Sequence, residues 1–214
     1  MSLKDFQDAR LMGSDSVVWS EHYRQARILW DKGFGKALGY DDFEHYLASI
    51  PPIGTSLFLP NEAFPHLVLV EGRLDIRRAV DFSGVSPITW NHPDGRTVHE
   101  YPEGPPRFPK KTNSGVRWMR CSCDIETWEL NFSEYSGGFF NRTIGLDAVE
   151  GIAFYVQHPH IFKQIRVGFM NSTRDPSHFY YLKEEQQNII VGFDDIDFKT
   201  LTRFPVRPTG NSWL

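Results

Sequence analysis

VRWMRCSCDI, from Val116 to Ile125, holds the clearest strand pattern in this chain. In an extended backbone successive side chains point to opposite faces. Met119, Cys121 and Cys123 therefore share one face with Ile125, and the residues between them take the other. The stretch predicts a central strand of a sheet.

Other short apolar runs are bounded by Pro, Gly or polar residues, which is typical of strands. The last two of these runs flank the polar segment Lys183–Asn188, so we expect them to form a hairpin. The predicted strands are Ser56–Leu59, His66–Val70, Val85–Trp90, Ile165–Phe169, Phe179–Leu182 and Ile189–Phe193.

Helical spacing marks the N-terminal part of the chain. Aromatic and apolar residues recur there at i, i+4, i+7 and i+11, which predicts one buried helical stripe made of Trp19, Tyr23, Ala26 and Trp30. A second helix is predicted to begin at Asp41, with Glu44 as its capping partner. Its inner face should carry Phe43, Tyr46, Leu47 and Ile50, and Pro51 and Pro52 should end it.

The clearest later helix is predicted from Leu146 to Gln157, where apolar residues keep helical spacing until Pro159. Helices first, then strands, one helix and more strands favour an α+β fold with a largely antiparallel sheet. The 214 residues suit a single domain. Its expected parts are a helical hairpin over residues 14–52, a sheet-containing body over 53–203 and a C-terminal tail over 204–214 that lies on the surface.

A long segment from Asn91 to Ser114 contains five Pro and is predicted to be irregular. Loops of this length in compact domains are usually functional or disordered. The segment carries His92, Asp94 and His99, with Glu100 next to them. A histidine beside a carboxylate can act as a base and its orienting group. Together with His158 and His160 they are the candidate catalytic residues.

A second constellation suits a metal ion. Cys121 and Cys123 should lie on one face of their strand, and His158 and His160 flank the proline that ends the late helix. Two thiolates and two imidazoles satisfy a tetrahedral zinc site. Small buried thiols also fill cores, which is the competing interpretation. The sequence predicts no other cofactor.

Composition narrows the classes of function. The net charge of −4 argues against a phosphate-tracking surface, so we expect no nucleic-acid partner. No apolar run of about 18 residues exists to cross a bilayer, and the first ten residues do not resemble a signal peptide. Two cysteines cannot build a disulfide framework. These features predict a soluble, cytoplasmic protein that does not act at membranes.

The motif of a phosphate-binding loop and that of a nucleophile elbow are both missing. Aromatic residues make up 14% of the chain and often line binding sites. Two functions are therefore weighed. The first is a binding or interaction protein with an aromatic-lined surface for a small molecule or a protein. The second is a small hydrolase-like enzyme, with or without the help of a metal ion, that would use the loop and helix-end histidines.

Three segments resemble an uncharacterised bacterial family of the actinobacterial type, known only as a domain of unknown function. They are Tyr23–Gln25 with Leu29 and Gly33, the strand Phe64–Val70, and the late helix from Leu146 to Pro159. Gly210, Asn211 and Trp213 echo its C-terminal ending, whereas Asn91–Ser114 departs from its pattern. The resemblance implies a bacterial, cytoplasmic, stand-alone domain and carries over no catalytic residue.

Overall fold

The computed structural model describes residues 13–58, 61–91, 97–100, 115–126, 143–163, 166–175, 178–185, 188–195 and 202–208. Its helices are α2 (Gly13–Asp31), α3 (Phe34–Ala37), α4 (Phe43–Ala48), α5 (Thr55–Phe58), α6 (Ile76–Ser83), α8 (Ala148–Gln157) and the 3-10 turn η3 (Pro159–Phe162). Its strands are β1 (His66–Glu71), β2 (Ile88–Asn91), β3 (Thr97–Glu100), β4 (Val116–Glu126), β5 (Thr143–Gly145), β6 (Arg166–Asp175), β7 (His178–Glu185), β8 (Asn188–Asp195) and β9 (Thr202–Pro208).

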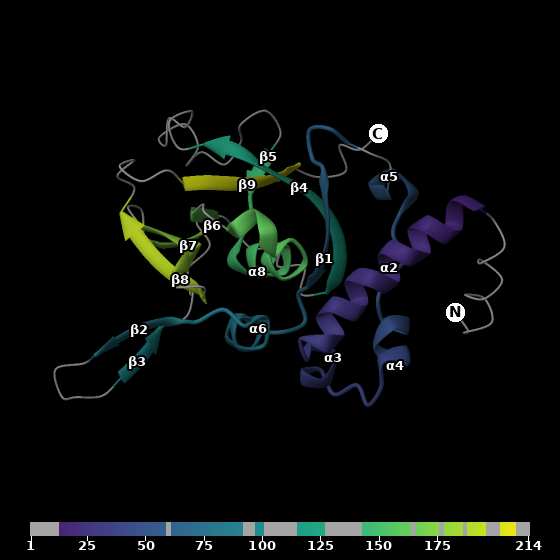
Figure 1. Ribbon diagram of the computed structural model, residues 1–214, viewed down its shortest axis with the longest axis horizontal. Helices are drawn as coiled ribbons and strands as arrows, with labels where there is room; N and C mark the ends of the chain where they lie inside the picture. Colours follow the sequence, from purple (N-terminus) through teal and green to yellow (C-terminus); the bar gives the residue numbers. More distant parts are fainter. Residues whose placement is uncertain are drawn as a thin grey trace.

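One sheet organises the molecule (Figure 1). Its strands follow the order β1-β4-β9-β6-β7-β8, with β5 beside β9, while β2 and β3 form a separate hairpin. The β6–β9 pair is parallel and the other strand pairs are antiparallel. The predicted α+β class with a largely antiparallel sheet is confirmed, as are the central strand over Val116–Ile125 and the β7–β8 hairpin.

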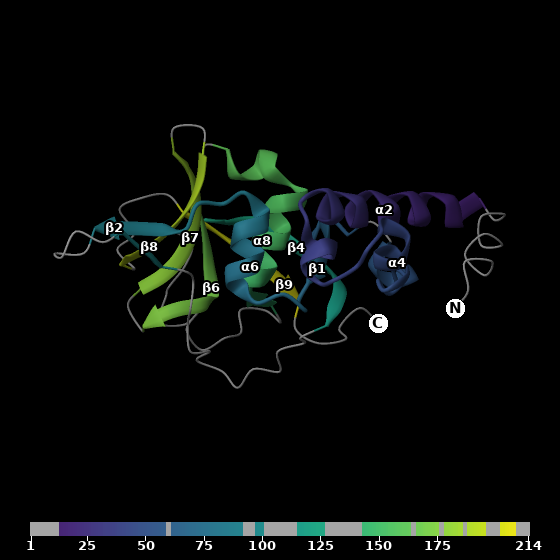
Figure 2. The same ribbon diagram turned by 90° about the horizontal axis from the view of Figure 1, so that it is seen from below.

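Helix α8 covers one face of the sheet (Figures 1 and 2). It begins with a capping box, in which Asp147 accepts from the Glu150 amide and Glu150 accepts from the Asp147 amide. Gly151 faces the buried ring of Phe169 on β6, and a Cβ atom at this position would lie within 2.0 Å of that ring. The close approach requires glycine. The predicted late helix is confirmed, with its first turn two residues later than expected.

The N-terminal helices lie beside the β1 end of the sheet (Figure 2). The rings of Phe43 and Tyr46 on α4 meet Trp30 of α2 at centroid distances of 6.0 and 5.9 Å. Phe43, Tyr46, Leu47 and Ile50 are buried, as predicted. The N-cap of α4 is Asp42, one residue later than the predicted helix start at Asp41, and its side chain accepts a hydrogen bond from the His45 amide.

The buried face of α2 differs from the predicted stripe. Tyr23 is 40% exposed, and Trp19 and Trp30 are half-buried. Among the residues of α2 whose burial is described, 17–31, those that are buried are His22, Gln25, Ala26 and Leu29. Ala26 is therefore the one member of the predicted stripe that is fully enclosed. The helix is rotated so that Gln25, a polar residue, meets the edge of β1.

A buried ion pair ties β1 to the N-terminal helices. Glu71, at the end of β1, is 1% exposed in its side chain and receives two hydrogen bonds from the Arg73 guanidinium, of 2.7 and 2.6 Å, and one from the Arg73 amide, of 3.2 Å. Tyr46 donates a fourth bond to Glu71, of 3.1 Å. Arg73 in turn donates to Tyr40 and Ser49. The carboxylate is thus compensated in charge and in hydrogen bonds, as a buried charge must be.

Several local predictions are wrong. Residues 55–58 form helix α5 instead of a strand, and α6 was not predicted. Part of the segment expected to be irregular, 97–100, forms β3. The strand expected from Val85 begins at Ile88, although Ser86 bridges to Ile190. Residues 204–208, expected in a surface tail, belong to β9, which lies between β4 and β6.

Candidate functional site

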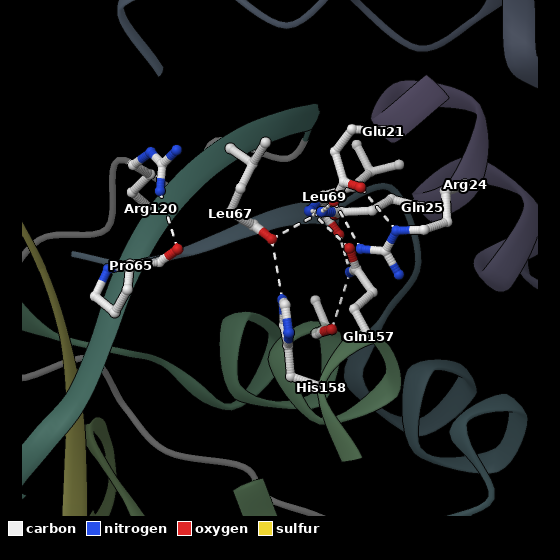
Figure 3. A network of polar contacts seen from close by, with 10 residues as sticks. Glu21, Arg24, Gln25, Pro65, Leu67, Leu69, Arg120, Gln157 and His158 are labelled. Carbon is white, nitrogen blue, oxygen red and sulfur yellow. Dashed lines mark hydrogen bonds and ion pairs between the residues drawn. The ribbon is translucent and has the colours of Figure 1, made fainter. Parts of the chain in front are cut away.

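The outer edge of β1 meets α2 and the end of α8, and polar contacts gather there (Figure 3). Among the described strands, β1 is the last on its side of the sheet, and β4 pairs with its other side. In an antiparallel pair every second residue directs its N–H and C=O away from the neighbouring strand. Leu67 and Leu69 are those residues here, because their backbone groups bond to side chains of the two helices. Free edges of this kind invite pairing with other chains.

Gln25 of α2 covers this edge as a residue of a parallel strand would. Its Nε2 donates to the Leu67 carbonyl over 2.8 Å, and its Oε1 accepts from the Leu69 amide over 2.7 Å. One amide group therefore bridges two backbone positions that are two residues apart. The side chain is fully buried, so these bonds form away from water.

Gln157, the last residue of α8, covers the same edge in the antiparallel manner. Its Oε1 accepts from the Leu69 amide over 3.0 Å, and its Nε2 donates to the Leu69 carbonyl over 2.7 Å. It also donates to the Ala153 carbonyl within its own helix. Leu69 N–H is thus shared by two glutamines, one from each helix (Figure 3).

Glu21, one helical turn before Gln25, forms an ion pair with Arg24. Arg24 donates to both carboxylate oxygens of Glu21, over 2.7 and 2.6 Å, and Gln25 donates to one of them over 2.6 Å. Burial alone would raise the pKa of Glu21, but the hydrogen bonds from Arg24 and Gln25 outweigh it, and the pKa is lowered. The carboxylate is therefore ionised and already engaged.

His158 follows Gln157 and turns its ring to the same strand. Its Nε2 lies 3.1 Å from the Leu67 carbonyl oxygen. A carbonyl only accepts, so Nε2 carries the proton and Nδ1 carries the lone pair. Burial lowers the pKa of His158, and the bond to Leu67 opposes that shift in part. The ring is neutral at pH 7.

Three imidazoles meet at this end of α8. The His158 ring lies 5.3 Å from that of His66 and 6.2 Å from that of His160, measured between centroids. The Phe154 ring lies 5.3 Å from His66 and 5.5 Å from His158, with interplanar angles of 42° and 54°. His66 and His158 are half-buried and His160 is exposed. We call His66, His158 and His160 the imidazole cluster.

The structure thus unites the two helix-end histidines that the sequence singled out. It adds His66, which the sequence placed on a strand but did not connect to a site. The sequence feature that could have singled out His66 is its position directly after Pro65, at the start of a strand. Its nearness to α8, however, follows only from the tertiary structure. Phe154 and Phe162, with centroids 5.4 Å apart, extend the ring contacts along α8 and η3.

The loop candidates are not part of this cluster as far as the structure describes them. His92 and Asp94 lie outside the described residues. His99 and Glu100 belong to β3, where they pair with Thr89 and Ile88. Both views show the β2–β3 hairpin projecting away from α8. The candidate catalytic residues of β3, His99 and Glu100, are therefore not brought to His158 and His160.

The two cysteines lie inside β4 and are free, as predicted. They are 0% and 2% exposed, and burial raises the pKa of the Cys121 thiol well above its ordinary value. Thiolates are the reactive and metal-binding form, which burial disfavours. Among the described residues, which include all four candidate zinc ligands, no group of three or more His, Cys, Asp or Glu side chains is arranged to hold a metal ion.

A further buried histidine, His22, joins α2 to β4. Its ring lies 5.4 Å from Trp19 and 5.4 Å from Trp118. Burial lowers its pKa to about 4. A neutral, enclosed ring between two indoles packs one element on another, and we assign it to the core.

In the described part of the chain no helix has the length and apolar character needed to cross a membrane. When the chain is compared with known protein families, with curated proteins and with solved structures, none of them matches it. The function is therefore inferred from the geometry of the imidazole cluster and its surroundings.

Proposed function

We propose that this protein is a binding or interaction protein and that its contact surface is the imidazole cluster at the end of α8. The observation that carries the proposal is the gathering of three imidazoles, two of them in ring contact with Phe154, on residues that are half-buried or exposed. Partly exposed rings offer large contact area and few rotatable bonds, together with polar atoms for recognition. This surface supports the aromatic-lined binding site expected from composition.

The hydrolase alternative keeps one supporting observation, the contact between His158 and His160. Two features weigh against it. A general base is usually oriented by a carboxylate, but His158 is oriented by the Leu67 carbonyl, and the oxygens of the nearby Glu21 are taken by Arg24 and Gln25. The thiol of Cys121 is buried and held in its protonated form at neutral pH.

Two measurements test the proposal. In the first, the folded protein is incubated with a fluorophosphonate probe and with iodoacetamide, and labelling is read by mass spectrometry. We expect no stoichiometric labelling of any single serine or cysteine. A residue that is labelled stoichiometrically, and whose labelling is lost in His158→Gln, would establish the hydrolase instead.

The second measurement is a thermal-shift panel of aromatic carboxylates, nucleosides and short acidic and aromatic peptides. A compound that binds the cluster should raise the melting temperature of the wild type and not that of His160→Asn. His45→Asn is the matched control, because His45 is an exposed histidine on α4, bonded to Asp42 over 2.7 Å. Stabilisation that is the same in all three proteins would place binding elsewhere and contradict our assignment.

We further propose that the partner is a small molecule or a protein, and neither a nucleic acid nor a membrane, on the grounds of charge and hydropathy given above. A cytoplasmic location is proposed because both cysteines are unbridged, which is usual in reducing compartments. A bacterial origin is proposed from the resemblance of three segments to the uncharacterised family.

A further inference from the structure

We infer that His158 and His160 form a binding site for a late first-row divalent metal ion, such as Ni²⁺, Cu²⁺ or Zn²⁺, with water completing the coordination. The inference rests on the proposed binding function and names a ligand class for the same surface. It differs from the zinc set expected from sequence, because the buried cysteines take no part.

The spacing of the two rings suits a shared ion. Metal–nitrogen bonds of about 2.1 Å put the centres of two imidazoles on one ion roughly 5.3 to 6.5 Å apart, depending on the angle at the metal. The observed centroid distance between His158 and His160 is 6.2 Å. His160 is exposed and lies on the short turn η3, so its ring is able to reorient toward an ion.

His158 already has the support that a metal-binding histidine needs. Such a histidine almost always donates its other ring N–H to a carbonyl or carboxylate, which fixes the tautomer and the ring orientation. His158 donates from Nε2 to the Leu67 carbonyl over 3.1 Å, which reserves Nδ1 for the ion. The carbonyl is itself held by Gln25 over 2.8 Å. The whole edge network therefore positions this ring.

Charge and protonation are also compatible with a cation. Metal binding requires an imidazole nitrogen with a free lone pair, and the bond from His158 Nε2 to the Leu67 carbonyl leaves Nδ1 as that nitrogen. Glu21 and Arg24, which interact electrostatically with His158, form an ion pair that is neutral as a unit. Nitrogen ligands favour Cu²⁺, Ni²⁺ and Zn²⁺ over Mg²⁺ or Ca²⁺. Since the described residues offer no group of three protein ligands, the site leaves open positions for water or for a group from a partner.

The test is isothermal titration of the tag-free protein with NiCl₂, ZnCl₂ and MgCl₂. We expect one Ni²⁺ or Zn²⁺ per chain and no heat from Mg²⁺. His160→Asn should weaken the affinity by about tenfold or more, as loss of a ligand or its support usually does. His45→Asn should leave it unchanged. Because His160 is exposed, its variant should fold as the wild type does, which circular dichroism checks.

Three results would overturn the inference: no binding by the wild type at millimolar metal, binding that persists in His160→Asn, or binding that is lost in His45→Asn. X-ray absorption of the zinc-loaded protein gives an independent reading, since only nitrogen and oxygen neighbours are expected and sulfur would point to the cysteines. Failure of metal binding leaves the thermal-shift test of the imidazole cluster untouched, so the two proposals fail separately.

Discussion

Replacing Gln25 or Gln157 by Leu changes the same edge of β1 in two different ways. In Gln25→Leu the Leu67 carbonyl keeps the bond from His158, and the Leu69 amide keeps the bond to Gln157. In Gln157→Leu the Leu69 amide keeps Gln25, but the Leu69 carbonyl loses the donor that the structure shows for it. Only the second substitution therefore strands a buried backbone group among the described contacts.

The difference between the two variants isolates that group. Both introduce a buried leucine of similar volume, so the gain in apolar burial cancels to first order. An unsatisfied buried carbonyl costs about 1 to 3 kcal/mol, and we expect Gln157→Leu to be less stable than Gln25→Leu by that amount. The double variant also strands the Leu69 amide, which each single variant still pairs. A coupling free energy of about 1 to 3 kcal/mol should follow.

Urea unfolding of the four proteins gives the double-mutant cycle, and hydrogen exchange of the Leu69 amide gives a local reading. Protection of that amide should survive in each single variant and fall in the double variant. The reasoning is refuted if Gln25→Leu costs as much as Gln157→Leu, or if the two costs add to within about 0.5 kcal/mol.

Three more outcomes follow from the packing and charges. Gly151→Ala should destabilise the protein by about 1 to 3 kcal/mol in thermal unfolding. The added Cβ would lie 2.0 Å from the Phe169 ring, and this clash should outweigh the roughly 1 kcal/mol gain in helix propensity. An equal or higher melting temperature would show that α8 can move to make room for the methyl group. Burial depresses the pKa of His22 from 6.5 to about 4, so as the pH falls the unfolded chain takes up the proton first. The stability that comes from keeping His22 neutral is therefore complete above about pH 6.5, and up to about 3 kcal/mol of it is lost as the pH falls toward 4. His22→Gln should flatten this part of the pH dependence of the unfolding free energy measured in urea. Glu71→Leu should lower the free energy of unfolding in urea by about 3 kcal/mol, which is the low end for a broken buried ion pair because Arg73 is partly exposed. A loss below about 1 kcal/mol would mean that water hydrates the Arg73 guanidinium in place of Glu71.

Local pattern was enough for elements whose signal is repeated within one segment. Three such elements were predictable from the sequence: the strand over Val116–Ile125, the late helix that ends before Pro159, and the β7–β8 hairpin. In each, the hydrophobic period and the residues that end the element lie within a few residues of each other. The pair His158 and His160 was predictable for the same reason, since both flank one proline.

What the pattern missed depends on partners far away in the chain. β9 is a strand because β4 and β6 lie on either side of it, and its own prolines and arginines resemble a tail. His66 reaches the imidazole cluster through the pairing of β1 with β4 and the packing of α8, which no local period encodes.

The rotation of α2 is the plainest case of what only tertiary structure decided. The apolar spacing by itself determined that this segment is a helix. By hydrophobicity alone, the buried stripe of that helix should hold Trp19, Tyr23 and Trp30. The edge of β1 directs N–H and C=O groups at α2, and the Gln25 side chain bonds to the Leu67 carbonyl and the Leu69 amide in addition to the bonds that these groups make with His158 and Gln157. The helix therefore buries Gln25 and leaves Tyr23 partly exposed. Hydrophobic spacing can be recognised within one segment of sequence. The N–H and C=O groups of a sheet edge that need partners outside the sheet are defined only once the sheet has formed.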